Sequence, residues 1–226
     1  AGQLFADSRP NATKVLLLLS DGQQTVDAAP GKTPSETSTD AAALLKANGV
    51  TVFAWGFGKE VNLTTLQQIA TDPSKALLTP DLNELNNYLA GLEATICNES
   101  PPPSAPPLPP SAPPPPKPPC ARPVDFSLVL DESGSMQNHV EGANGSKAFA
   151  GRVVSQYALG GANARFSVVS FAADATMRVA WSSSEGEIIA GIDEMVADGQ
   201  TSISDGFQAA GQLFADSRPN ATKVLL

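Results

Sequence analysis

The sequence has few of the side chains on which many hydrolases and zinc proteins depend. It contains one histidine, His139, and two cysteines, Cys97 and Cys120. A single histidine with no nucleophile at a recognisable spacing gives no support to a histidine-based catalytic triad. Zinc, in turn, is usually bound by cysteine and histidine side chains. We therefore do not expect the chain to be an enzyme.

Basic side chains and long apolar runs are scarce as well. Against 23 aspartates and glutamates stand 14 lysines and arginines, which gives a net charge of −9. This charge argues against nucleic acid as a partner, because neutralising phosphates requires a basic face. It is compatible with cation binding. The longest apolar runs, such as Val15–Leu19, are far shorter than the roughly 20 residues needed to span a bilayer.

What the sequence does contain is a long repeat. Residues 1–17 and residues 210–226 both read AGQLFADSRPNATKVLL, so 17 consecutive positions recur with a period of 209 residues. A recurrence of this length indicates a tandem array. The natural unit then starts near Cys120, runs to Leu226 and resumes at Leu18. With 42% hydrophobic and 16% charged residues, a unit of this size is expected to form one globular domain.

A proline-rich segment, residues 98–119, holds 13 of the 20 prolines. Proline fixes φ and donates no backbone hydrogen bond, so polyproline II is expected, as a rod about 65–70 Å long. A spacer is the first interpretation; the alternatives are a ligand for proline-binding domains and a strut around which domains or glycans pack. Its serine-then-proline pattern also resembles the hydroxyproline-rich glycoproteins of plant and algal walls, which implies hydroxylated and O-glycosylated prolines.

On either side of this linker, strand-like and helix-like patterns alternate. Apolar runs predict strands at 125–131, 165–172, 175–181, 14–20, 50–57 and 76–78. Helical spacing predicts helices at 146–159, 187–195, 204–215, 63–69, 82–96 and, opened by Thr37 or Ser38, 40–47. The alternation favours an α/β fold with a mostly parallel, doubly wound, Rossmann-like sheet and helices on both faces. Ligands of such sheets bind at the carboxyl ends of the strands.

Three of the expected loops carry oxygen-bearing side chains. The loop after the first strand of the unit reads DESGS at 131–135, Thr201 precedes a helix, and Asp21 directly follows the strand at 14–20. Carboxylate and hydroxyl oxygens suit Mg²⁺, Mn²⁺ or Ca²⁺ and not zinc. An incoming carboxylate would complete the coordination shell. The predicted ligands are Asp131, Ser133, Ser135, Thr201 and Asp21.

Together, these loops resemble the metal-ion-dependent adhesion site of the von Willebrand factor A (VWA) family. That site has the form Asp-x-Ser-x-Ser with a distant threonine and a distant aspartate, and each part has a counterpart here. The resemblance covers everything outside the proline-rich linker. It implies a divalent cation, Mg²⁺ or else Ca²⁺ or Mn²⁺, that takes an acidic side chain or a glycan from a partner.

Other polar residues near the loops have simpler interpretations. Glu132 lies between two predicted ligands and is interpreted as a solvated surface acid. Asp205 falls in the first turn of the following helix, where an acid complements the helix dipole; a supporting role at the site is the alternative. Residues 31–33, GKT, match a phosphate loop only in part, because position 26 is valine where the motif needs glycine.

Cysteines and glycosylation sequons indicate an oxidising compartment. Because the two ends of a VWA domain lie close together, the resemblance implies that Cys120 pairs with the next repeat's counterpart of Cys97; two free thiols are the alternative. We therefore expect an extracellular location, at a cell surface or in a matrix. The candidate N-glycosylation sites are Asn11, Asn62, Asn98, Asn144 and Asn220.

The point at which the chain cuts the repeat leads to a further expectation. Residues 1–97 would be the C-terminal half of one VWA domain, and residues 120–226 the N-terminal half of the next. Because a stiff linker separates them, we expect composite domains, in which 120–226 of one copy joins 18–97 of the next. In a single chain Asp21 should then lie far from Asp131.

The predicted function is that of an adhesion or assembly module in a surface fibre or matrix. Adjacent repeats and a partner with an acidic side chain or a glycan would be its contacts. The alternative is a purely structural glycoprotein filament with an inert or internally occupied metal site.

Overall fold

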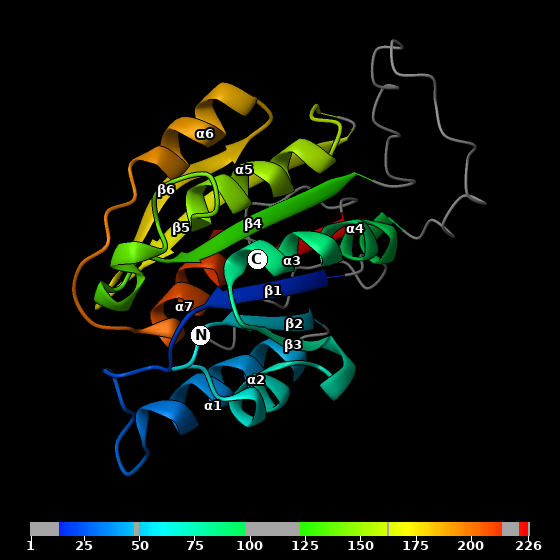
Figure 1. Ribbon diagram of the computed structural model, residues 1–226. Coiled ribbons are helices and arrows are strands. Elements are labelled where there is room, and N and C mark those ends of the chain that lie inside the picture. The colour runs from blue at the N-terminus through cyan, green and yellow to red at the C-terminus, as the bar shows by residue number, and fades with distance from the viewer. Residues whose placement is uncertain (1–13, 48–49, 98–122, 162, 214–221, 226) are drawn as a thin grey trace.

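The computed structural model describes residues 14–47, 50–97, 123–161, 163–213 and 222–225 (Figure 1). Their strands are β1 (Lys14–Ser20), β2 (Val50–Phe57), β3 (Ala76–Thr79), β4 (Val124–Asp131), β5 (Ala164–Phe171), β6 (Ala175–Ser182) and β7 (Thr222–Leu225). The helices are α1 (Pro34–Ala47), α2 (Leu63–Ile69), α3 (Leu82–Leu85), α4 (Leu89–Cys97), α5 (Ser146–Gln156), α6 (Glu185–Asp193) and α7 (Ile203–Leu213). None of these helices is long and apolar enough to cross a membrane.

The strands form one sheet in the order β3-β2-β1-β7-β4-β5-β6. Every neighbouring pair is parallel except β5 and β6, which form an antiparallel hairpin. Parallel strands end at the same edge of a sheet, so the loops that follow β1 and β4 open on one side of the molecule. The predicted, mostly parallel α/β sheet is confirmed.

Helices cover both faces of the sheet (Figure 1). Alternate residues of each strand point to opposite faces: Leu18 packs with side chains of α1, α2 and α7, whereas Leu19 packs with side chains of α3, α4, α5 and α6. Strand β4 is buried at all eight positions, as its continuous apolar run predicts. Its one charged interior residue, Asp125, is paired with Arg165 at 2.8 Å.

The two halves of the chain meet in this sheet. Strand β1 comes from the first half and β4 from the second, and the pairing of Leu19 with Leu130 joins them directly. The expectation that a single chain keeps its halves apart is therefore wrong. Strand pairing and buried packing between the halves outweigh the stiffness that the linker sequence predicts. The linker itself, residues 98–119, lies outside the described residues.

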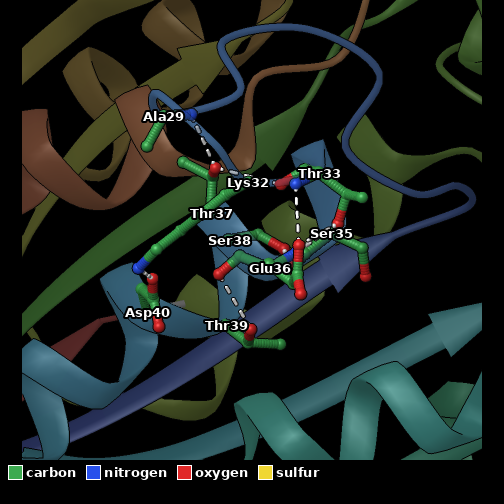
Figure 2. A network of polar contacts seen from close by, with 9 residues as sticks. All are labelled: Ala29, Lys32, Thr33, Ser35, Glu36, Thr37, Ser38, Thr39 and Asp40. Carbon is green, nitrogen blue, oxygen red and sulfur yellow. Dashed lines mark hydrogen bonds and ion pairs between the residues drawn. The ribbon is translucent and has the colours of Figure 1, made fainter.

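Helix α1 begins six residues before the predicted start at position 40, because a different residue caps it. Thr33 and Glu36 form a reciprocal capping box, in which the Thr33 amide donates to Glu36 Oε2 at 2.8 Å and the Glu36 amide donates to Thr33 Oγ1 at 3.2 Å (Figure 2). Pro34 occupies the first helical position, where its missing amide hydrogen costs nothing. Residues 31–33 are thus the start of a helix, and Lys32 pairs with Asp40.

The predicted helix at 82–96 is divided into α3, a 3₁₀ turn at Asn86–Tyr88, and α4. Its apolar residues nevertheless stay on one side, because Leu82, Leu85, Leu89 and Leu92 are all buried. Spacing alone therefore predicted the buried face correctly and missed the change in helix type.

Candidate metal centre at the carboxyl edge of the sheet

The pairing of Leu19 with Leu130 sets the ends of β1 and β4 side by side. Ser20, the last residue of β1, donates from Oγ to Asp131 Oδ2 at 2.8 Å. In the following loops, Ser135 Oγ donates to Asp21 Oδ1 at 2.8 Å. Asp21 therefore lies at the same site as Asp131 in one chain, and the prediction that it would lie far away is wrong.

The loop at 131–135 turns back on its own aspartate. The Ser133 amide donates to Asp131 Oδ1 at 2.9 Å, and the hydroxyls of Ser133 and Ser135 lie 3.1 Å apart. Both carboxylate oxygens of Asp131 thus accept hydrogen bonds, one from its own loop and one from Ser20. Four of the five predicted ligands, Asp131, Ser133, Ser135 and Asp21, are joined by this chain of contacts.

The fifth predicted ligand, Thr201, belongs to a loop that is bonded to both of the others. Its amide donates to Thr25 Oγ1 at 2.9 Å, and its carbonyl accepts from the Thr25 amide at 2.9 Å. Beside it, the Gly134 amide donates to the Gly199 carbonyl at 2.9 Å. The three loops therefore form a closed set, and Thr201, only 4% exposed, is held inside it.

Glycine at position 134 permits this approach of the loops. A Cβ atom there would lie 3.0 Å from the Gly199 carbonyl oxygen, closer than most real Cβ contacts. Gly199 itself has φ of +76°, a conformation that favours glycine. A larger residue at position 134 would push the Thr201 loop away from the loop at 131–135.

Both aspartates are buried, and burial changes their titration. Removal from solvent raises the pKa of Asp131 to about 6, an increase that the hydrogen bonds from Ser133 and Ser20 limit and the nearby charge of Asp21 adds to. Burial also raises the pKa of Asp21, while the hydrogen bond from Ser135 lowers it. Two carboxyl groups are thus held close together in a place that disfavours their charges.

These residues fit a hard divalent cation. They offer carboxylate and hydroxyl oxygens, the donors that Mg²⁺, Mn²⁺ and Ca²⁺ prefer, and a cation would offset the burial of two acids. Within the described residues, no group of three or more histidine, cysteine, aspartate or glutamate side chains is placed to hold a metal. The candidate centre therefore depends on hydroxyl groups and two acids, a combination that leaves coordination positions for water or an outside ligand.

Glu132 does not match its interpretation as a solvated surface acid. Its side chain is buried, 5% exposed, and accepts from Arg178 Nη2 at 2.9 Å, Ser170 Oγ at 2.8 Å and the Val196 amide at 3.1 Å. Its carbonyl also accepts from the Asp198 amide at 2.9 Å. Glu132 therefore ties the loop at 131–135 to edge strand β6 and to the segment that leads to Thr201. Its main partner lies 46 positions away, so no local pattern could have indicated this role.

Ser20 and Asp205 are the other residues near the site whose roles the structure clarifies. Ser20 was not among the predicted ligands, yet its position directly before Asp21 at the end of a strand is a signal that could have indicated it. Asp205 lies in the first turn of α7, as the helix-dipole interpretation predicts, and its side chain bonds to Ser202.

The structure describes only some of the residues for which glycosylation or disulfide pairing is predicted. Asn62 and Asn144 are exposed, and Asn62 also caps α2 by accepting from the Thr64 amide at 2.8 Å. Asn11, Asn98 and Asn220 lie outside the described residues, as do Cys120 and the side chain of Cys97. Their modification and pairing stay predictions.

Two family models of the von Willebrand factor type A domain match the chain. One matches residues 126–226, which hold most of β4 and the DESGS loop, and the other matches residues 2–90, which hold β1 and Asp21. The fold is that of a VWA domain. Among curated proteins the search found no match.

Solved structures similar to the chain include a bacterial protein and two proteins of extracellular assemblies. An uncharacterized protein from Alicyclobacillus acidocaldarius is 17% identical over 92% of this chain and 96% of its own, with a TM-score of 0.58, a likeness that shows the fold alone. Proximal thread matrix protein 1 from the mussel byssus, described with a zinc-occupied MIDAS motif, is 28% identical over 89% of this chain, with a TM-score of 0.36. The chain spans 46% of that protein's length. The vWF domain of the pilus tip protein Mfa5 from Porphyromonas gingivalis is 20% identical over 42% of this chain and 34% of its own, with a TM-score of 0.37.

Proposed function

We propose that the chain is a non-catalytic, adhesion-type VWA module of an extracellular repeat protein. A divalent cation, Mg²⁺ or else Mn²⁺ or Ca²⁺, would be held by Asp131, Ser133, Ser135, Thr201 and Asp21. When bound, it would supply a Lewis-acidic position for a carboxylate or a glycan oxygen of a partner. The observation that carries the proposal is the hydrogen bond between Ser135 and Asp21, which closes the ligand set across two strands.

Calorimetric titration with Mg²⁺ and Mn²⁺ tests the cation. Wild type should bind one ion per chain, and Asp131→Ala should bind none while its circular dichroism spectrum stays that of wild type. Asp193→Ala is the matched control, because Asp193 is exposed at the end of α6. Unchanged affinity in Asp131→Ala would show that the site is not the one proposed. A Zn²⁺ titration completes the series, and the oxygen donors predict weaker binding there.

A purely structural filament is the second candidate, and one observation favours it. The carboxylates of Asp131 and Asp21 already accept hydrogen bonds from Ser20, Ser133 and Ser135 of the same chain. With its hydrogen bonds satisfied within the chain, such a site needs no ligand from a partner. Chelation separates the two functions: an adhesion module loses partner binding and keeps fibre integrity, whereas a structural site loses neither or loses integrity.

The extracellular location rests on the cysteines and sequons of the sequence. N-glycan release followed by mass spectrometry of Asn62 and Asn144, both exposed, would test it directly. Glycan at either residue supports secretion, and unmodified asparagine at both in the natural protein argues against it.

A further inference from the structure

Strands β1 and β7 are two copies of one sequence that lie side by side in the sheet. Lys223 of β7 pairs with Lys14 of β1, and Val224 pairs with Val15, in parallel. These partners are one repeat period, 209 residues, apart. The sheet therefore contains the repeated segment twice, with each residue opposite its own counterpart.

The two repeated segments, β1 and β7, have the same register relative to β4. Strand β7 pairs Lys223 with Asp125, and the counterpart Lys14 stands 111 positions before Asp125. Strand β1 pairs Leu19 with Leu130, again 111 positions apart. If β1 followed β4 along its whole length, Lys14 would lie where Lys223 lies now. Either β1 or β7 can therefore pair with the same stretch of β4 in the same register.

The presence of β7 limits how β1 can reach β4 in this chain. Alongside Val124–Ser127 the neighbour of β4 is β7, so β1 lies one strand further out there. Direct pairing of β1 with β4 occurs only at Leu19 and Leu130. Among the described strands the repeated segment thus occurs twice and the acceptor strand β4 once, and the strand that brings Asp21 is the one displaced.

The contacts between the two halves do not depend on their being in one chain. Besides the strand pairing, they consist of hydrogen bonds such as Ser204 amide to Gln24 Oε1 at 3.0 Å, Thr201 amide to Thr25 Oγ1 at 2.9 Å and Arg152 Nε to Asn86 Oδ1 at 2.7 Å. A second copy can make every one of them, which is the condition for domain swapping.

We propose that the unit 14–97 is exchangeable between copies of this chain, so that a second copy supplies β1 and, with it, Asp21 to the site built on β4. The closed single chain is one form, and an exchanged dimer or longer assembly is the other. The partner is a second copy of the same chain, and its contribution completes the metal centre. The Mn²⁺-binding test of this inference rests on the proposed function. The test by dimer formation does not.

Complementation between two full-length variants tests the exchange. Asp21→Ala and Asp131→Ala chains, each with a different affinity tag, are unfolded together in urea, refolded together and analysed by light scattering, sequential tag capture and Mn²⁺ calorimetry. Exchange predicts dimers that carry both tags. It also restores about a quarter of the wild-type sites, because random pairing makes half the dimers mixed and each mixed dimer has one intact site. The control mixes Asp21→Ala with a chain that carries both Asp21→Ala and Asp131→Ala. This mixture should give mixed dimers and no Mn²⁺ binding.

The outcomes are distinguishable. If wild type binds Mn²⁺ while the refolded mixture stays monomeric, separates by tag and binds none, the exchange is overturned and the proposed function stands. If wild type itself binds no Mn²⁺, the proposed function fails, and dimers with both tags, or their absence, decide the exchange.

Discussion

Ser135 and Asp21, 114 positions apart, meet through a hydrogen bond of 2.8 Å. The serine belongs to the loop after β4 and the aspartate to the loop after β1. Their contact joins the loops that follow two different strands into one candidate site. Because Asp131 and Asp21 are both buried, the loops around them need specific hydrogen-bond donors.

Ser20→Ala should lower the free energy of unfolding by about 2 kcal/mol, because Asp131 Oδ2 then loses the hydroxyl donor at 2.8 Å inside the protein. Urea unfolding in chelator measures the change. Ser183→Ala, at an exposed serine after β6, is the control and should stay within about 0.5 kcal/mol of wild type. Equal stability of the two variants would show that the Ser20 hydroxyl does not support Asp131.

Glu132→Ala should be more damaging, by about 3–5 kcal/mol, because it leaves Arg178 without its buried partner. It should also weaken Mg²⁺ binding, since the Glu132 carboxylate holds the segment that leads to Thr201 through the amide of Val196. Urea unfolding and calorimetry measure the two effects. Glu185→Ala, exposed in the first turn of α6, should cost less than about 1 kcal/mol. A stable Glu132→Ala protein with normal Mg²⁺ affinity contradicts the role assigned to Glu132.

Thr33→Ala removes the cap of α1 and should cost about 1 kcal/mol of unfolding free energy without changing Mg²⁺ affinity. The capping box lies at the start of the helix and away from the three loops of the site. Thr39→Ala, at a half-buried position further along the same helix and outside the capping box, should be neutral within about 0.5 kcal/mol. Thermal unfolding of the pair distinguishes them, and a larger loss in Thr39→Ala would refute the capping assignment.

Cys120 is predicted to pair with the Cys97 of another repeat. Chains grown in light and heavy nitrogen, refolded together under oxidising conditions and digested without reduction, test this pairing. In the exchanged assembly, disulfide-linked peptides with one light and one heavy half are expected. Purely light and purely heavy Cys97–Cys120 pairs would place the bridge within a chain, and complete alkylation of both cysteines would remove the argument for an oxidising compartment.

The sequence by itself determined most of the sheet and which residues form the candidate site. Continuous apolar runs predicted buried strands such as β4. Leucines at helical spacing predicted the helices, even around Asn86–Tyr88, where the helix type changes. Asp131 and Asp21 could be predicted as neighbours in a complete domain, because parallel strands bring their carboxyl ends to one edge. The spacing of Thr33 and Glu36 also indicates the start of α1, but Thr37 and Ser38 offered alternative N-caps.

Only the tertiary structure decided which chain supplies Asp21, where β7 lies and what Glu132 does. The linker's prolines describe local stiffness, whereas the meeting of the halves depends on the pairing of Leu19 with Leu130 and on the packing around it. Repetition in the sequence shows that two segments are identical, but only the sheet shows that β7 lies beside Val124–Ser127 of β4 and that β1 lies on the far side of β7 there. Glu132 is buried because Arg178 and Ser170 face it from neighbouring strands, and such partners, distant in sequence, exist only once the sheet has formed.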